Sequence, residues 1–330
     1  MKPAAPSTEA NSAFETAEAA CPLCGGPARY AYSGRDQMFG LHRRHDYYCC
    51  ADCGAAFQHP MPDPQAIASF YPPDYGVYDE KERTRSIGAW RRALLRRCRG
   101  YRHLPVPPPL RLLAAAMAPF VEPPGTPLFV PGGRMLDVGC GNGRYLATLR
   151  ALGWQAQGVE FSAEGVRVCR LSGLSVHHGD LASAAFDAGA FDLVTVRHVI
   201  EHIAEPHPFM AELARILKPG GRLHLETPNS EALGRAWFGP NWYHNDVPRH
   251  LILYSPANLE RLASSHGLRK VETAMESSPK ALLNSLDYAM GDRATPSRKS
   301  RWRRLLARIY VSLSRRSGRG DTFRLVLTKP

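Results

Sequence analysis

The chain has 330 residues, of which 44% are hydrophobic, so it is long and apolar enough for a full α/β domain plus a smaller module, and disorder throughout is excluded. Its formal net charge is +12, from 42 basic and 30 acidic residues. Residues 1–20 lack the basic start and apolar run of a signal peptide, and the longest apolar stretch, residues 110–121, is interrupted and too short to span a bilayer. We therefore expect a cytoplasmic protein with a flexible N terminus over residues 1–20.

Two matching cysteine knuckles of the form C-x2-C-G follow this N terminus. They contain Cys21, Cys24, Cys50 and Cys53. Each knuckle brings two thiolates together, and two knuckles complete the tetrahedral set of a closed, structural zinc site. Cys49 offers an alternative C-x3-C spacing, but Cys50 reproduces the first knuckle. A disulfide framework fits a cytoplasmic chain poorly. The pattern predicts a zinc-ribbon module over residues 21–60.

Residues 61–129 read as an aromatic, proline-rich linker followed by a basic helical segment. The aromatic residues between Phe70 and Tyr78 either pack the ribbon onto the main domain or close over a substrate. From Lys81 to Arg111 the chain has ten basic residues and one acid, Glu82. A second basic segment, Arg293 to Arg319, has ten basic residues and no acid, so the rest of the chain is mildly acidic.

The main domain, residues 130–330, is organised around a glycine loop. Residues 135–138 predict a short buried strand, after which Gly139, Gly141 and Gly143 force a tight turn into a helix. Such a loop lets the backbone approach a ligand and exposes N–H groups at the helix start. NAD and S-adenosylmethionine are both candidates.

Two residues decide between these cofactors. Arg144 occupies the third small-residue position of the dinucleotide fingerprint, where close helix-to-strand packing is needed. Asp137 would repel a pyrophosphate, whereas its carboxylate suits the amino group of a methionine. The loop therefore favours S-adenosylmethionine.

The residues that follow supply the rest of a nucleoside pocket. A second strand, residues 154–161, carries Glu160 about 20 positions after the loop, the spacing at which a carboxylate meets ribose hydroxyls. A third strand, residues 174–178, leads to Asp180, which is placed to accept from the adenine amino group. The further expected cofactor contacts at strand ends are Phe161, Leu181 and Arg197.

Strands predicted at 191–196, 222–229, 270–274 and 322–327 would complete a seven-stranded sheet with a reversed last strand. Before that last strand lies a long basic helical insertion, residues 276–321. Its apolar residues repeat with helical spacing opposite arginines. They are Trp302, Leu305, Leu306, Ile309, Tyr310 and Leu313.

Several motifs in order resemble the class I S-adenosylmethionine-dependent methyltransferases over roughly residues 130–275. They are D-V-G-C-G-N-G (137–143), the strand end at Glu160, G-D-L (179–181), F-D-L-V-T-V (191–196), E-H-I (201–203) and L-K-P-G-G-R-L (217–223). The resemblance implies a Rossmann-like α/β fold with the seven-stranded class I methyltransferase sheet, and methyl transfer from S-adenosylmethionine.

The ribbon, the linker and two later motifs, at residues 226–229 and 241–251, are also similar to bacterial methyltransferases that modify sugars of surface glycans and natural products. This narrower resemblance implies a small-molecule or lipid-linked sugar acceptor and O- or C-methylation. A zinc-containing RNA methyltransferase is the main alternative, since the chain is basic and its ribbon begins C-P-L-C. Against RNA stand the longer ribbon spacing and the lack of an N-P-P-Y-type motif after the fourth strand. A non-catalytic binding module is a second alternative.

Ligands of open α/β sheets bind at the carboxyl ends of the strands, which selects the residues after the fourth and fifth strands for chemistry. His198, Glu201 and His202 are spaced to share one helical face, and His250 is expected to join them. The group would supply a general base, hold a second divalent metal, or only pack against the cofactor. H-x-x-E-H is similar to the E-x-x-E-H metal motif of some ubiquinone-pathway and small-RNA methyltransferases, with His198 in place of the first Glu.

The two basic segments predict an anionic partner. Arginine beside Trp and Leu suits the inner face of a membrane that carries a lipid-linked glycan, and this would make the protein peripheral there. RNA would attract the same charge. The competing interpretation is a solvated helix face whose apolar stripe docks on the protein itself. The sequence does not predict an oligomeric state.

Overall fold

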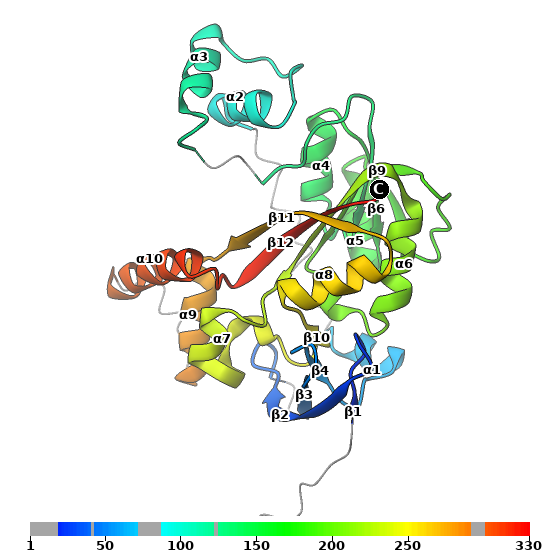
Figure 1. The fold of residues 1–330 in the computed structure, drawn as a ribbon, viewed down its shortest axis with the longest axis vertical. Helices are drawn as coiled ribbons and strands as arrows, with labels where there is room; N and C mark the ends of the chain where they lie inside the picture. Colours follow the sequence, from blue (N-terminus) through cyan, green and yellow to red (C-terminus); the bar gives the residue numbers. More distant parts are fainter. Residues whose placement is uncertain (1–18, 41–42, 72–86, 122–124, 292–300) are drawn as a thin grey trace, which may run out of the picture.

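A computed structural model of the chain describes residues 19–40, 43–71, 87–121, 125–291 and 301–330. Several expectations lie outside these ranges: nearly all of the N terminus 1–20, the linker beyond Tyr71, and the basic residues from Lys81 to Arg85 and from Arg293 to Lys299. The described residues form two sheets, shown in Figure 1 with helices packed around the larger one.

The larger sheet has seven strands in the order β11-β12-β9-β8-β5-β6-β7. Its parallel strands are β5 (Arg134–Val138), β6 (Gln155–Glu160), β7 (Ser175–His178), β8 (Phe191–Arg197) and β9 (Leu217–Pro228). The late strand β12 (Thr322–Thr328) pairs antiparallel with both β9 and β11 (Arg269–Glu276). The predicted seven-stranded α/β sheet with its reversed strand is therefore confirmed.

The central strands are short apolar runs because both of their faces are covered. Met135 and Leu136 of β5, and Val194 and Val196 of β8, are fully buried. The covering helices are α4 (Arg144–Ala151), α5 (Ala163–Leu171), α6 (Pro206–Ile216) and α8 (Pro256–Ser265). The segment 218–221 ends α6 as expected. The strand β9 nevertheless begins before it, at Leu217, so this turn is an irregularity within the strand.

The smaller sheet combines the ribbon with a strand from the main domain. Its order is β1 (Ala19–Ala20), β2 (Pro27–Arg35), β3 (Arg44–Cys50), β4 (Ala56–Gln58) and β10 (Ile252–Leu253). The last two pair antiparallel, Ile252 with Phe57 and Leu253 with Ala56. Figure 1 shows this sheet below the larger one. The sheet of the ribbon is therefore completed by a strand that begins two residues after His250.

The remaining helices form two pairs and two shorter pieces. The pieces are α1 (Pro64–Ser69) and α7 (Leu233–Phe238). The pairs are α2 (Ala89–Cys98) with α3 (Pro108–Met117), and α9 (Pro279–Ala289) with α10 (Arg301–Arg316). The basic insertion is thus a helix pair beside the reversed strand (Figure 1). No helix in the described ranges is both long and apolar enough to cross a bilayer.

Candidate functional site

The glycine loop joins β5 to α4 and has the backbone that its sequence requires. Gly139, Gly141 and Gly143 all have positive φ, of 70°, 55° and 74°. A Cβ on Gly139 would lie 2.3 Å from Val199 Cγ2, and one on Gly143 would lie 2.5 Å from Leu174 Cδ1. Side chains are therefore excluded by both conformation and space, and the loop leaves a cradle of backbone groups for a ligand.

Two buried carboxylates flank this loop. Asp137 is 3% exposed, and its Oδ1 accepts a hydrogen bond of 2.6 Å from Thr195 Oγ1. Burial raises the pKa of Asp137 to about 6, against the opposing effects of Thr195 and Arg197. Glu160 accepts from the N–H of Gly141 at 2.7 Å, so the end of β6 is tied to the loop.

The other expected cofactor contacts lie at the same ends of neighbouring strands. Asp180, after β7, is exposed and accepts from the N–H of Ser183 at 2.7 Å, while Leu181 is buried. Phe161 follows Glu160 and is 75% exposed, so its ring is open to stack on a planar ligand. Backbone cradle, paired carboxylates and apolar surface together fit the nucleoside and amino-acid ends of S-adenosylmethionine.

Arg197 is held by one side chain of the sheet and one of helix α4. Its Nε donates to Glu226 Oε2 at 3.0 Å, and its guanidinium lies 4.4 Å from the ring centre of Tyr145. Glu226, on β9, also faces His198, whose Nε2 is 3.4 Å from Glu226 Oε1. Arg197 therefore helps to fix a carboxylate that the sequence interpretation did not include.

The segment from His198 to His202 is not the continuous helical face that the spacing predicted. His198 has a left-handed backbone, with φ of 54°, and its N–H donates to Glu226 O at 2.8 Å. This bond prolongs the strand pairing, so helical turns begin only with the three-residue 3-10 helix η2 (Ile200–His202). The geometry still places His198 Nδ1 3.4 Å from Glu201 Oε1.

His198 is therefore positioned between two carboxylates. The side chain is 42% exposed, and partial desolvation opposes a charged imidazole, but the carboxylates of Glu201 and Glu226, each 3.4 Å away, outweigh it and raise the pKa of His198 to about 10. At neutral pH this side chain is an imidazolium that balances the two acids.

Glu201 is completely buried and half satisfied. Its Oε2 accepts a hydrogen bond of 2.8 Å from Thr227 Oγ1, whereas its Oε1 accepts none from the described residues and is met by the ion pair with His198 at 3.4 Å. His250 Nε2 lies 3.9 Å from this Oε1. This oxygen has charged partners nearby but no hydrogen bond, so it can still accept a donor or bind a cation.

The two neighbouring histidines present lone pairs at the same place. His202 Nδ1 is 2.9 Å from Arg249 O, and His250 Nδ1 is 2.8 Å from His244 O. Because a carbonyl oxygen only accepts, each Nδ1 carries a proton, and in a neutral ring this leaves the lone pair on Nε2. Burial and the charge of His250 lower the pKa of His202 to about 4, so its ring is neutral at pH 7.

Glu201, His202 and His250 are therefore a group that could hold a divalent cation. One ligand atom from each lies within 4.8 Å of the other two. Histidine ligands usually donate their second N–H to a carbonyl, as both do here. His198 is not in this group, although its Nδ1 lies 3.4 Å from the same Glu201 Oε1.

The smaller sheet positions His250. The fully buried guanidinium of Arg249 lies 2.9 Å from Asp36 and 2.7 Å from Asp246. Tyr47 Oη donates to His250 O at 2.9 Å, and Tyr71 Oη lies 3.0 Å from His202 Nδ1. Residues before the main domain thus hold both histidines.

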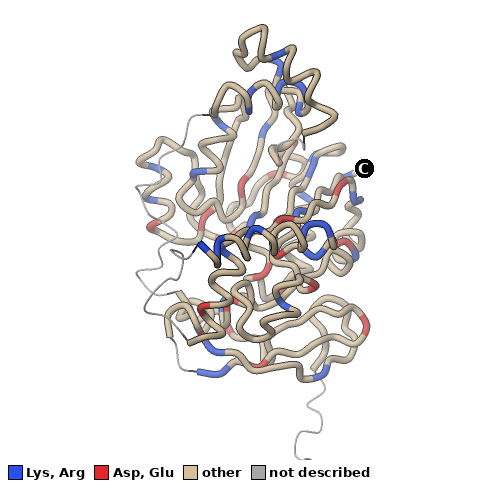
Figure 2. The backbone as a smooth tube through the Cα atoms, turned by 90° about the vertical axis from the view of Figure 1, so that its left-hand side faces the viewer, with Lys and Arg blue, Asp and Glu red and all other residues tan. Residues whose placement is uncertain are grey.

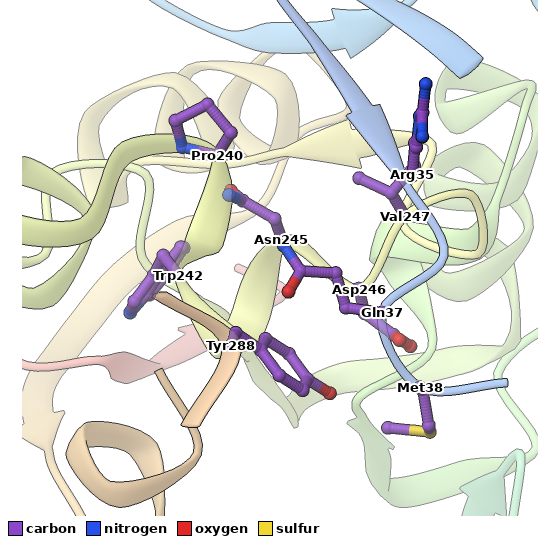
Figure 3. A pocket seen from close by; sticks show the side chains of 9 residues that line it. All are labelled: Arg35, Gln37, Met38, Pro240, Trp242, Asn245, Asp246, Val247 and Tyr288. Atoms are coloured by element: carbon purple, nitrogen blue, oxygen red, sulfur yellow. The ribbon is translucent and has the colours of Figure 1, made fainter. Parts of the chain in front are cut away.

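Two cavities lie where the smaller sheet contacts the main domain. Figure 3 shows the smaller, of about 10 Å³, which has room for about one water. Its labelled side chains come from the end of β2 and from the segment 240–247, with Tyr288 beneath. A more open cavity of about 420 Å³ is lined partly by Tyr32, Arg235 and Arg319.

The cysteine knuckles converge in the smaller sheet. Cys21 Sγ is 3.6 Å from Cys53 Sγ, and Cys24 Sγ is 3.5 Å from Cys50 Sγ. All four sulfur atoms lie within 4.8 Å of one another, in a group that does not include Cys49. Each knuckle closes with the same backbone bond, from the glycine N–H to the carbonyl of the first cysteine. The donor set fits one tetrahedral zinc ion.

Comparison with known proteins gives a consistent result. A family model described as a methyltransferase domain matches residues 110–273. The ubiquinone biosynthesis O-methyltransferase of Thiobacillus denitrificans is 34% identical over 163 residues, covering 45% of this chain and 70% of that protein. The enzyme of the same name from Burkholderia pseudomallei is 31% identical over 156 residues, covering 43% and 67%.

Among solved structures, a SAM-dependent methyltransferase from Archaeoglobus fulgidus matches with 18% identity and a TM-score of 0.45, over 66% of this chain and 94% of its own. The family match spans both the glycine loop and the residues from His198 to His250. The chain therefore belongs to the class I S-adenosylmethionine-dependent methyltransferases and is an enzyme of that family.

Proposed function

We propose that the protein is an O-methyltransferase whose acceptor hydroxyl loses its proton beside Glu201, His202 and His250, and that these three residues hold a divalent cation. The observation that carries the proposal is the convergence of one buried carboxylate oxygen and two histidine lone pairs within 4.8 Å. When bound, S-adenosylmethionine supplies a methyl group on a sulfonium, ready for in-line displacement by an oxygen. The chain's own residues hold the reactants in line and exclude water.

The pKa values favour a cation over a lone general base. Burial raises the pKa of Glu201, but His198 and His250 hold it at about 2, and the pKa of His202 is about 4. Both values are too low for efficient proton abstraction near neutral pH. The same values keep both groups deprotonated, as cation ligands must be. A bound cation would lower the pKa of a nearby hydroxyl.

The acceptor is proposed as a hydroxylated small molecule. The curated relatives are named for ubiquinone biosynthesis and for O-methylation, while the ribbon and linker motifs resemble enzymes that methylate sugars. A ring phenol and a sugar alcohol both present an oxygen nucleophile, so the proposed site serves either. No contact among the described residues favours RNA over these acceptors.

The proposal is tested by methyl transfer from labelled S-adenosylmethionine to two probe sets, catechol-type phenols and nucleotide-linked or lipid-linked sugars. We expect transfer to oxygen, a loss of at least tenfold after chelation, and recovery when Mg²⁺ or Mn²⁺ is restored. Metal analysis must show that the cysteine-bound zinc persists during chelation. Full activity in the chelated protein would show that Glu201, His202 and His250 act without a cation, as a general base. Transfer to nitrogen or RNA alone would refute O-methylation.

A second expectation concerns the donor and pH. Because the pKa of Asp137 is about 6, its carboxylate becomes protonated below that pH and can no longer pair with the donor's ammonium group. The donor's α-amino group has a pKa of about 8 and stays charged there. The Kd for S-adenosylmethionine should therefore rise about fivefold between pH 6 and pH 5. Calorimetry across pH 5–8 measures this. Asp137→Asn should bind weakly with a flat profile, and a flat wild-type profile would contradict the assignment.

A further inference from the structure

The helix α10 of the basic insertion has three distinct rows of side chains, at about 100° per residue. One row docks on the protein: Ala307, Tyr310 and Ser314 are buried, and Arg303 pairs with Asp287 at 2.8 Å. Ala307 and Tyr310 pack in one cluster with Leu282 and Leu283 of α9. The helix is therefore anchored without using its other two rows.

The second row is apolar and uncovered. It is formed by Trp302 (70% exposed), Leu305 (52%), Leu306 (44%), Ile309 (48%) and Leu313 (49%). The predicted stripe thus splits, because Tyr310 alone of its six members turns inward. Single exposed apolar residues are ordinary, but five in one row are a continuous patch of the kind that marks an interaction surface.

The third row is basic. It contains Arg301, Arg304, Arg308 and Arg315, and the helix has no acidic residue. None of these four makes an ion pair with a residue in the described ranges. Figure 2 faces the side of the molecule on which α10 lies and shows Lys and Arg along it. The first basic segment differs, since Arg96 and Arg111 donate to carbonyls of their own segment.

We propose that α10 binds the surface of an anionic phospholipid bilayer, with its apolar row in the boundary between headgroups and acyl chains and its arginines on lipid phosphates. Charge alone would also attract RNA. RNA would leave the apolar row in water, whereas a bilayer accommodates Trp302 and the aliphatic side chains together with the arginines. An anionic bilayer is therefore the partner that matches both rows, because the apolar row and the basic row are adjacent on one helix.

This partner deepens the proposed function, because it places the enzyme where a lipid-linked or otherwise amphiphilic acceptor resides. It rests on residues outside the methyl-transfer site, so each proposal can fail without the other. Both uncovered rows lie away from the docked face, and substitutions there should leave the fold intact.

Sedimentation of the full chain with vesicles tests the surface. We expect binding to phosphatidylglycerol-containing vesicles, little to pure phosphatidylcholine, and release by high salt. Leu305→Ser combined with Ile309→Ser should abolish binding. Arg301→Gln, Arg304→Gln and Arg308→Gln together should weaken partitioning about 100-fold, at roughly fivefold for each basic residue.

The matched control is the pair Leu171→Ser and Val271→Ser, which removes two apolar side chains of similar exposure elsewhere on the surface, 71% and 49% exposed. This variant should bind vesicles like the wild type. All variants should methylate a water-soluble acceptor at the wild-type rate. Equal vesicle binding by the α10 variants and the wild type would refute the proposal, as would tight RNA binding without vesicle binding.

Discussion

Replacing Glu201 by glutamine should lower kcat on the order of 10³-fold, because loss of the proposed cation removes several kcal/mol of charge stabilisation, while changing the Kd for S-adenosylmethionine less than twofold. The amide oxygen can still accept the hydrogen bond from Thr227, so the main change is the loss of negative charge at Oε1. That charge both binds the proposed cation and balances His198. Single-turnover rates with saturating donor, together with calorimetry for donor affinity, measure the two effects separately.

Glu205→Gln is the control, because this exposed glutamate lies four positions later and is not in the three-residue group. It should retain wild-type turnover. A second variant, His250→Gln, should reproduce the loss in kcat and lower cation affinity, since it removes another ligand. If Glu201→Gln turns over at the wild-type rate, the group is structural and the acceptor is activated elsewhere.

Cys24→Ser should abolish zinc binding and lower methyl transfer at least tenfold, although Cys24 lies in the smaller sheet. The side chain is exposed, so serine costs little packing and the effect reports the metal. Loss of the ion frees the knuckles that hold β2 and β3, and with them Asp36 and Tyr47, which fix Arg249 and His250. Structural zinc contributes folding free energy directly, so the thermal midpoint should fall by roughly 10 °C or more.

The matched control is Cys49→Ser, a neighbouring thiol outside the four-sulfur group. It should keep about one zinc per chain, the wild-type midpoint and the wild-type rate. Donor binding should survive in both variants, because the glycine loop belongs to the other sheet. A zinc-free Cys24→Ser protein with full activity and an unchanged midpoint would show that the knuckles do not support the site.

The sequence predicts the glycine loop and its flanking strand well, because their geometry is local. Gly139, Gly141 and Gly143 need positive φ wherever the chain goes next, and the strands beside them are short apolar runs. The zinc-ligand choice of Cys50 over Cys49 was likewise readable from a repeated turn. Such features depend on spacing over a few residues.

The proposed acceptor site depends on contacts between distant segments. Asp36 and Arg249 are 213 positions apart, and nothing near Asp36 signals its partner. The helical spacing of His198 and His202 was misleading because the backbone bond to Glu226 delays the turn. A signal for Thr195 did exist, since a hydroxyl in an otherwise apolar central strand needs a buried acceptor, here Asp137.

Periodicity also left one question open in α10. It identified six apolar residues on one side of the helix, but it gives no information on which part of that side meets the protein. Only the packing of α10 on α9 shows that Tyr310 is buried while Trp302 and its neighbours stay exposed.

The pairing of β4 with β10 bears on how such enzymes are assembled from parts. A ribbon whose edge strand hydrogen-bonds to Ile252 and Leu253 cannot be exchanged between relatives at a cut near residue 60. A ribbon transplanted alone would lack strand β10 and Arg249, which complete its sheet and pair with Asp36. Chimeras should therefore exchange residues 19–71 and 242–254 together, because these segments are distant in sequence but form one folded unit.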